Sequence, residues 1–120
     1  MLMRSAVAAL LVTLLGACAG AAPTEEIADR AAMESDGRDI AEAQCAACHS
    51  VGPYGDSPNT SAPPFRTVLT RYSADVLEEE LIAGIQVAHP MPDFQFNPQG
   101  ADALIAYLQS IQQLPRSPAP

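Results

Sequence analysis

The stretch Cys45-Ala46-Ala47-Cys48-His49 holds two thiols three positions apart, followed directly by an imidazole. This is the spacing that attaches a c-type haem. On one helical turn both thiols project to the same face, where each can form a thioether with a haem vinyl group. His49 then lies where a ring nitrogen can bind the iron. The sequence therefore predicts a covalently bound haem at Cys45, Cys48 and His49.

Two other kinds of site use a similar spacing, a zinc half-site and a thioredoxin-like redox pair. A structural zinc site takes four ligands, and beyond the three residues of the motif the best remaining nitrogen or sulfur ligand is His89. A thioredoxin-like pair lies near a βαβ pattern, and this sequence has none. Haem is the favoured interpretation of the three.

The chain is short and acidic, with 120 residues, a formal net charge of −8 and only arginine among its basic residues. A domain of this size buries a small core, and a covalently bound haem would stabilise it further. The charge argues against binding to nucleic acid, because few groups could neutralise phosphates. A solvated surface explains the acidity most simply, and a partner steered by charge would present a basic face.

Residues 1–21 have the pattern of an export signal. Arg4 gives a positive start, residues 6–17 form an apolar run without charge, and small residues follow. The run is shorter than the ~20 residues of a membrane-spanning helix. Its end, Leu15-Gly16-Ala17-Cys18, resembles the lipobox of bacterial lipoproteins, which implies acylation of Cys18. The alternatives are ordinary cleavage after residues 19–21 and an uncleaved anchor.

The rest of the chain divides by composition into three parts. Residues 22–34 are predicted to be a tether, with or without a helical turn or two, that would hold the domain off a bilayer; a disordered terminus without a role is the alternative. Residues 35–114 are predicted to form the folded domain, and the proline-rich residues 115–120 a disordered tail. The first firm helix is expected to begin at Ser35, which can cap it, and to end near Ser50.

The predicted fold class is all-α, because helical periodicity recurs and no strand-like alternation stands out. A short helix is expected over 65–72, with its apolar residues on one side. Ser73 is predicted to cap the next helix, and Asn97 followed by Pro98 to begin the last one. The expected core residues of the last two helices are Leu77, Leu81, Ile85, Leu104, Leu108 and Ile111.

A second axial ligand for the iron is found by elimination among the methionines. Met1 and Met3 leave with the leader, and Met33 is too close to the haem motif to reach its far side. Met91 remains, held between two prolines. A thioether ligand raises the reduction potential and suits electron transfer. His89 and an open sixth position are the competing possibilities, and a role for Met91 in filling the core is the plainest alternative.

Residues 35–114 resemble a class I c-type cytochrome of the small monohaem kind found in bacterial periplasms. The resemblance implies three to five short helices wrapped around one haem c, with His49 and Met91 as iron ligands. It rests on four motifs in the expected order, namely Cys45-Ala46-Ala47-Cys48-His49, Ala62-Pro63-Pro64-Phe65, Met91-Pro92-Asp93-Phe94 and Ala106-Tyr107-Leu108.

The same resemblance implies two packing details. A glycine eight residues before the first haem cysteine lets the N-terminal helix cross an aromatic residue of the C-terminal helix, and Gly37 and Tyr107 are the matching residues. A proline carbonyl accepts a hydrogen bond from the proximal histidine and fixes its ring. Pro63 is the first choice for that carbonyl, with Pro64 as the alternative.

The expected function is that of a periplasmic one-electron carrier in a Gram-negative bacterium, and not that of an enzyme. Its potential would be set by Met91, by hydrogen bonding at His49 and by exclusion of water by Phe65, Phe94 and Phe96. One alternative is an electron-transfer subunit of a membrane dehydrogenase or oxidase. Another is a small-ligand-binding or peroxidase-like haem protein with a detachable sixth ligand. The chain lacks the lysines by which mitochondrial cytochromes c dock to oxidase, so the same partner is not implied.

Overall fold

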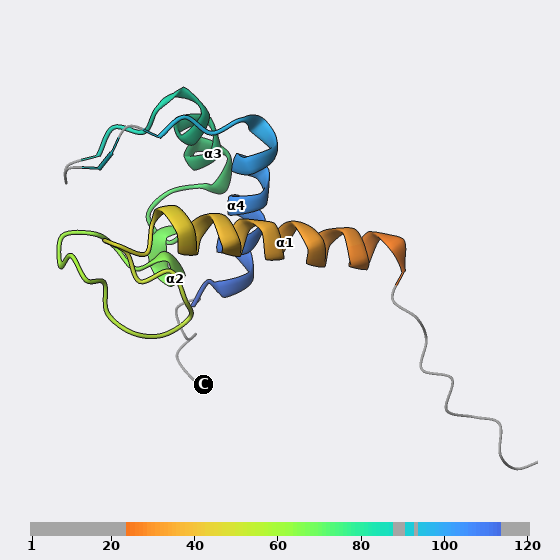
Figure 1. The fold of residues 1–120 in the computed structure, drawn as a ribbon, viewed down its shortest axis with the longest axis horizontal. Helices are drawn as coiled ribbons and strands as arrows, with labels where there is room; N and C mark the ends of the chain where they lie inside the picture. The colour runs from red at the N-terminus through yellow and green to blue at the C-terminus, as the bar shows by residue number, and fades with distance from the viewer. Residues whose placement is uncertain (1–23, 88–90, 93, 114–120) are drawn as a thin grey trace, which may run out of the picture.

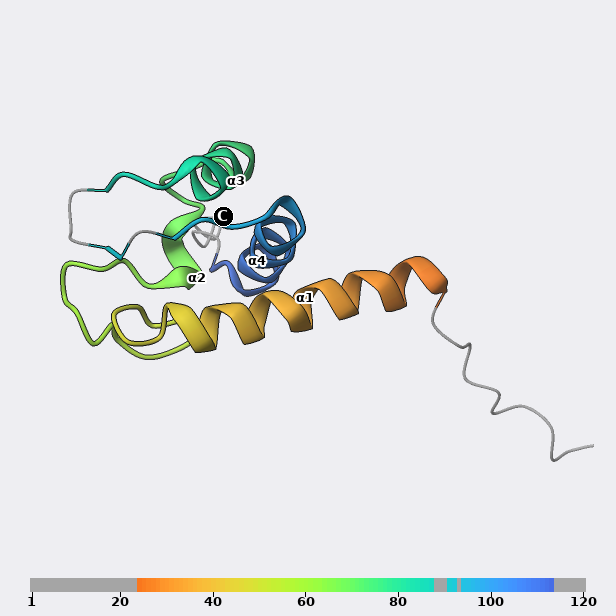
Figure 2. The same ribbon diagram turned by 45° about the horizontal axis from the view of Figure 1, so that its top comes forward.

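Four α-helices make up the regular structure of the computed structural model, which describes residues 24–87, 91–92 and 94–113. No strand occurs in these ranges, so the prediction of an all-α fold is confirmed. Helix α4 lies between α1 and α3 and also contacts α2 (Figures 1 and 2). The helices are α1 (Glu25–Gln44), α2 (Phe65–Val68), α3 (Ala74–Ala83) and α4 (Pro98–Ile111).

The last helix, α4, begins where the sequence predicts and forms the centre of the fold. Asn97 caps it, because its side-chain oxygen accepts a hydrogen bond from the Gly100 N–H at 2.7 Å, and Pro98 occupies the first turn, where no N–H is needed. One apolar stripe of α4 is buried against the other helices. Its buried residues are Ala101, Ala103, Leu104, Ile105, Tyr107 and Leu108.

Helix α1 crosses α4 at Gly37, which is buried. A Cβ atom at this position would lie 2.9 Å from the Cβ of Tyr107 and would collide with the backbone carbonyl of Ala103. The two helices therefore touch backbone to backbone, an approach that only glycine allows. The predicted pairing of Gly37 with Tyr107 is confirmed.

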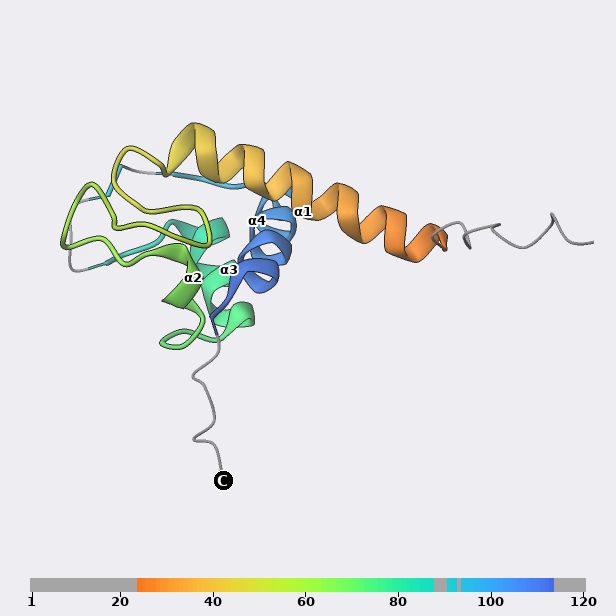
Figure 3. The ribbon, with the colours of Figure 1, turned by 90° about the horizontal axis from the view of Figure 1, so that it is seen from below.

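Helix α1 begins at Glu25, so the expected start at Ser35 is wrong, and the segment predicted to be a tether is helical from Glu25 on. Alanine and glutamate are strong helix formers, and acidic residues in the first turn favour the positive end of the helix. Arg30 and Glu34 add an ion pair of 3.0 Å one turn apart. This N-terminal part of α1 extends beyond α4 (Figures 1 and 3).

Helix α1 ends at Gln44, before the haem motif, and not near Ser50. The chain then makes a turn in which the Cys45 carbonyl accepts hydrogen bonds from the N–H of Cys48 at 3.1 Å and of His49 at 2.9 Å. His49, at the end of this turn, is buried. The motif thus lies on a tight turn that follows the helix.

The two shorter helices bury Phe65 and Val68 of α2 and Leu77 and Leu81 of α3. The expected core residue Ile85 lies beyond the end of α3 and is half-buried. The first, α2, is shorter than predicted, because the chain turns after Val68 and leaves Tyr72 exposed. Helix α3 is capped as predicted, since the Ser73 hydroxyl accepts a hydrogen bond from the Val76 N–H at 3.4 Å.

Some of the predicted segments lie outside the described residues. These are the export signal over 1–21 with Cys18, the tail over 115–120, and His89. Within the part of the chain that is described, none of the helices combines the length and the apolar character needed to cross a membrane.

We expect Gly37→Ala to lower the free energy of unfolding by about 1–3 kcal/mol or more, because the new methyl group must push α1 away from the backbone of α4. Chemical denaturation of the haem-containing protein measures this change. Gly52→Ala is the matched control, because a Cβ at Gly52 meets nothing within 4 Å. Equal stability of the two variants would contradict the close crossing.

Candidate haem site

His49 is buried and its ring is held in a defined orientation. Its Nδ1 lies 2.8 Å from the carbonyl oxygen of Pro63, the proline that was the first choice in the sequence analysis, ahead of Pro64. A carbonyl can only accept, so Nδ1 donates the hydrogen bond and carries the proton. In a neutral imidazole the lone pair is then on Nε2, which is the atom that can bind a metal.

Residues around the start of α2 form one side of the His49 environment. The Phe65 ring packs against the imidazole with a centroid distance of 5.0 Å and an interplanar angle of 46°. The Phe65 N–H donates to the carbonyl of Ser50 at 2.9 Å. Two contacts of His49, with Pro63 and with Phe65, and the backbone bond from Phe65 to Ser50 therefore connect the start of α2 to the haem motif.

A mostly apolar cavity lies beside His49, and most of the predicted site residues line it. Leu81 of α3, Leu104 of α4 and Phe96 complete its apolar wall. The predicted residues that line it are Cys45, Cys48, His49, Phe65, Met91 and Phe94. The structure thus brings together residues from positions 45 to 104 around one space.

The two thiols face an environment that suits an apolar ligand. Cys45 and Cys48 are half-buried and form no disulfide. Burial raises the pKa of the Cys45 thiol from 9.0 to about 11, so the thiol stays neutral at physiological pH. Within the described ranges, no three His, Cys, Asp or Glu side chains come together as a metal site, and His89 lies outside these ranges.

Tyr107, which the family resemblance places at the haem site, does not line the cavity. Its hydroxyl donates to the carbonyl of Val51 at 2.8 Å, and its Cβ lies at the Gly37 crossing. Tyr107 therefore contacts both α1 and the chain directly after the haem motif. Pro63 likewise does not line the cavity and acts through His49.

Sequence reasoning placed Leu81 and Leu104 in the core but did not assign them to the site. Both belong to apolar stripes with helical spacing, and that periodicity is the same for a core residue and for a residue in the wall of a pocket. Only the packing of α3 and α4 around the cavity separates the two roles.

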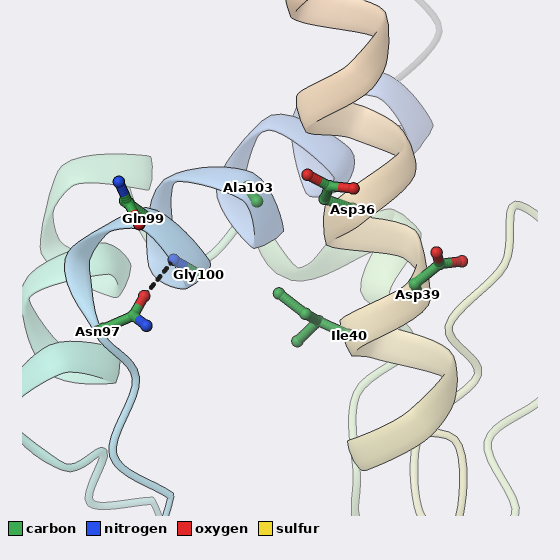
Figure 4. A pocket seen from close by; sticks show the side chains of 7 residues that line it. All are labelled: Asp36, Asp39, Ile40, Asn97, Gln99, Gly100 and Ala103. Carbon is green, nitrogen blue, oxygen red and sulfur yellow. Dashed lines mark hydrogen bonds between the residues drawn. The ribbon is translucent and has the colours of Figure 1, made fainter.

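Two larger hollows have the wrong chemistry for haem. One, of about 410 Å³, lies between α1 and α4 and is lined by Asp36, Asp39 and Asn97 among others (Figure 4). Another, of about 510 Å³, lies near the end of α3 and includes Gln86 and Gln95. Neither contains a thiol, an imidazole or a thioether, so the smaller cavity beside His49 is the candidate site.

The donors around this cavity fit a c-type haem, since they comprise two thiols, one imidazole and one thioether.

The comparisons with known proteins agree with this chemistry. Residues 34–112, more than half of the chain, match the sequence profile of the family described as cytochrome c. Neither a curated protein nor a solved structure gives a significant match. Members of this family carry a covalently attached haem c, and Cys45 and Cys48 are consistent with its attachment motif. The chain therefore belongs to the cytochrome c family, as a class I c-type cytochrome with an all-α fold and haem c as its cofactor.

Proposed function

We propose that the protein is a one-electron carrier in which thioethers at Cys45 and Cys48 hold the haem and His49 and Met91 bind its iron. The family supports electron transfer with haem c as the general function. One observation carries the finer assignment, namely that all four side chains line a single, mostly apolar cavity. The haem iron supplies a one-electron ferric/ferrous couple when it is bound.

The residues around the cavity would set the reduction potential of that couple without forming or breaking covalent bonds. The hydrogen bond from His49 to Pro63 fixes the imidazole and raises its basicity as a ligand. Phe65, Phe94 and Phe96 would exclude water. Among the described lining residues there is no carboxylate, lysine or arginine that could serve as an acid–base group, which favours a carrier over a peroxidase-like protein.

We expect Met91→Ala to abolish the absorption band that reports an iron–thioether bond, near the red edge of the spectrum of the ferric protein. The reduction potential should fall by at least about 59 mV, a tenfold change for a one-electron couple. The ferrous variant should also bind carbon monoxide at neutral pH, because the sixth position opens. Visible spectra and a redox titration measure all three.

Met33→Ala is the matched control for this experiment, because Met33 lies on the exposed part of α1. It should keep the band, the potential and the resistance to carbon monoxide. Survival of the band in Met91→Ala would exclude Met91 as a ligand. Carbon monoxide binding by the unsubstituted protein would favour a small-ligand-binding function.

We further propose that the protein acts in the periplasm of a Gram-negative bacterium, anchored to the membrane through a lipid on Cys18. The support is the pattern of residues 1–21, with its lipobox-like end. The 35–114 domain would then exchange electrons with a dehydrogenase, an oxidase or another cytochrome. A partner steered by charge would be basic, since the chain carries a net charge of −8.

The lipid anchor predicts that the protein fractionates with membranes and that its mature N-terminus is an acylated Cys18. Cell fractionation followed by mass spectrometry of the N-terminal peptide measures both. A soluble protein that begins at Ala22 would contradict the anchor, although it would leave the haem site unaffected.

A further inference from the structure

The side chain of Gln112, which follows the last residue of α4, makes three hydrogen bonds to backbone groups. Its Nε2 donates to the carbonyl of Phe65 at 2.7 Å and to the carbonyl of Leu108 at 2.9 Å. Its Oε1 accepts from the N–H of Leu69 at 3.1 Å. Carbonyls can only accept and an N–H can only donate, so these partners fix the orientation of the amide.

Two of these bonds hold the opposite ends of α2. Phe65 is the first residue of this four-residue helix, and Leu69 directly follows its last residue. A helix of one turn has too few internal hydrogen bonds to be stable alone, so its position depends on contacts with other segments. The N–H of Gln113 adds a bond to the carbonyl of Arg66 at 2.8 Å. The end of α4 and α2 lie side by side (Figures 1 and 3).

The position of α2 in turn determines the surroundings of His49. Pro63, whose carbonyl accepts from Nδ1 of His49, lies two residues before Phe65. Phe65 itself packs its ring against the imidazole. A shift of α2 would therefore move both the hydrogen-bond acceptor and the aromatic neighbour of this ring. No other side chain in the described ranges is seen to bond to both ends of α2.

We propose that Gln112 is a positioning residue for the proximal imidazole, acting through α2 on the bond from His49 to Pro63. Gln112 touches neither the cavity nor His49, so its effect would be indirect. A hydrogen bond at Nδ1 sets the orientation and basicity of a ligating imidazole. Gln112, which is 63 positions after His49 in the sequence, would thus influence the orientation and basicity of the iron ligand. The inference rests on the proposed role of His49 as iron ligand.

Hydrogen exchange of the His49 Nδ1 proton, followed by NMR in the reduced protein, tests this proposal. In Gln112→Ala we expect its exchange rate to rise at least tenfold relative to that of the Leu104 amide, which lies in the buried part of α4. Gln112→Glu should give a smaller rise, because its carboxylate still accepts from Leu69 but donates to nothing.

Gln113→Ala is the matched control. Its side chain donates only to the carbonyl of Pro53, at 2.9 Å, and its backbone bond to Arg66 is kept. The ratio of the two exchange rates should stay at the unsubstituted value. Unchanged ratios in both Gln112 variants, or a parallel rise of both rates, would overturn the proposal, since a parallel rise reports a general loss of stability. Failure of the His49 ligation itself would show separately, in the visible spectrum of the unsubstituted protein.

Discussion

The backbone contact between α1 and α4 at Gly37 determines where the haem motif can lie. An α-helix rises 1.5 Å per residue, so the eight residues from Gly37 to Cys45 place the first thiol about 12 Å along α1 from the crossing. There it faces the cavity whose wall includes Leu104 of α4. With a larger residue at position 37, the helices would separate and the motif would move away from that wall.

The imidazole of His49 depends on segments that are far apart in the sequence. The carbonyl of Pro63 orients it, the ring of Phe65 packs against it, and Gln112 bonds to both ends of α2, the short helix that begins at Phe65. Tyr107 supports the motif from the other side through the carbonyl of Val51. A rigid ligand environment of this kind suits electron transfer, because the protein then changes little between the two oxidation states of the iron.

The sequence was informative wherever one local feature has a strong consequence. The motif from Cys45 to His49 predicted the cofactor, Asn97 and Pro98 predicted the start of α4, and Gly37 predicted the crossing. The motif and the cap depend on a rare spacing and a capping side chain and need no knowledge of the whole fold, whereas the pairing of Gly37 with Tyr107 came from the family resemblance.

The expectations that failed depended on competition between structures or on distant contacts. The start of α1 was misplaced because Ser35 is a good cap, although the residues before it are strong helix formers. Tyr107 was placed among the haem-site residues by the family resemblance, and only the packing shows its hydroxyl bonded to the carbonyl of Val51, outside the cavity. The bonds of Gln112 to α2 have no periodic signal, since they join residues more than 40 positions apart.

The account depends above all on the covalent bonds between haem and the two thiols, and mass spectrometry of the exported protein in denaturant measures these most directly. The polypeptide should keep the mass of one haem, and Cys45 and Cys48 should take up no alkylating label. A polypeptide of the bare mass, with a label on both cysteines, would contradict the central claim.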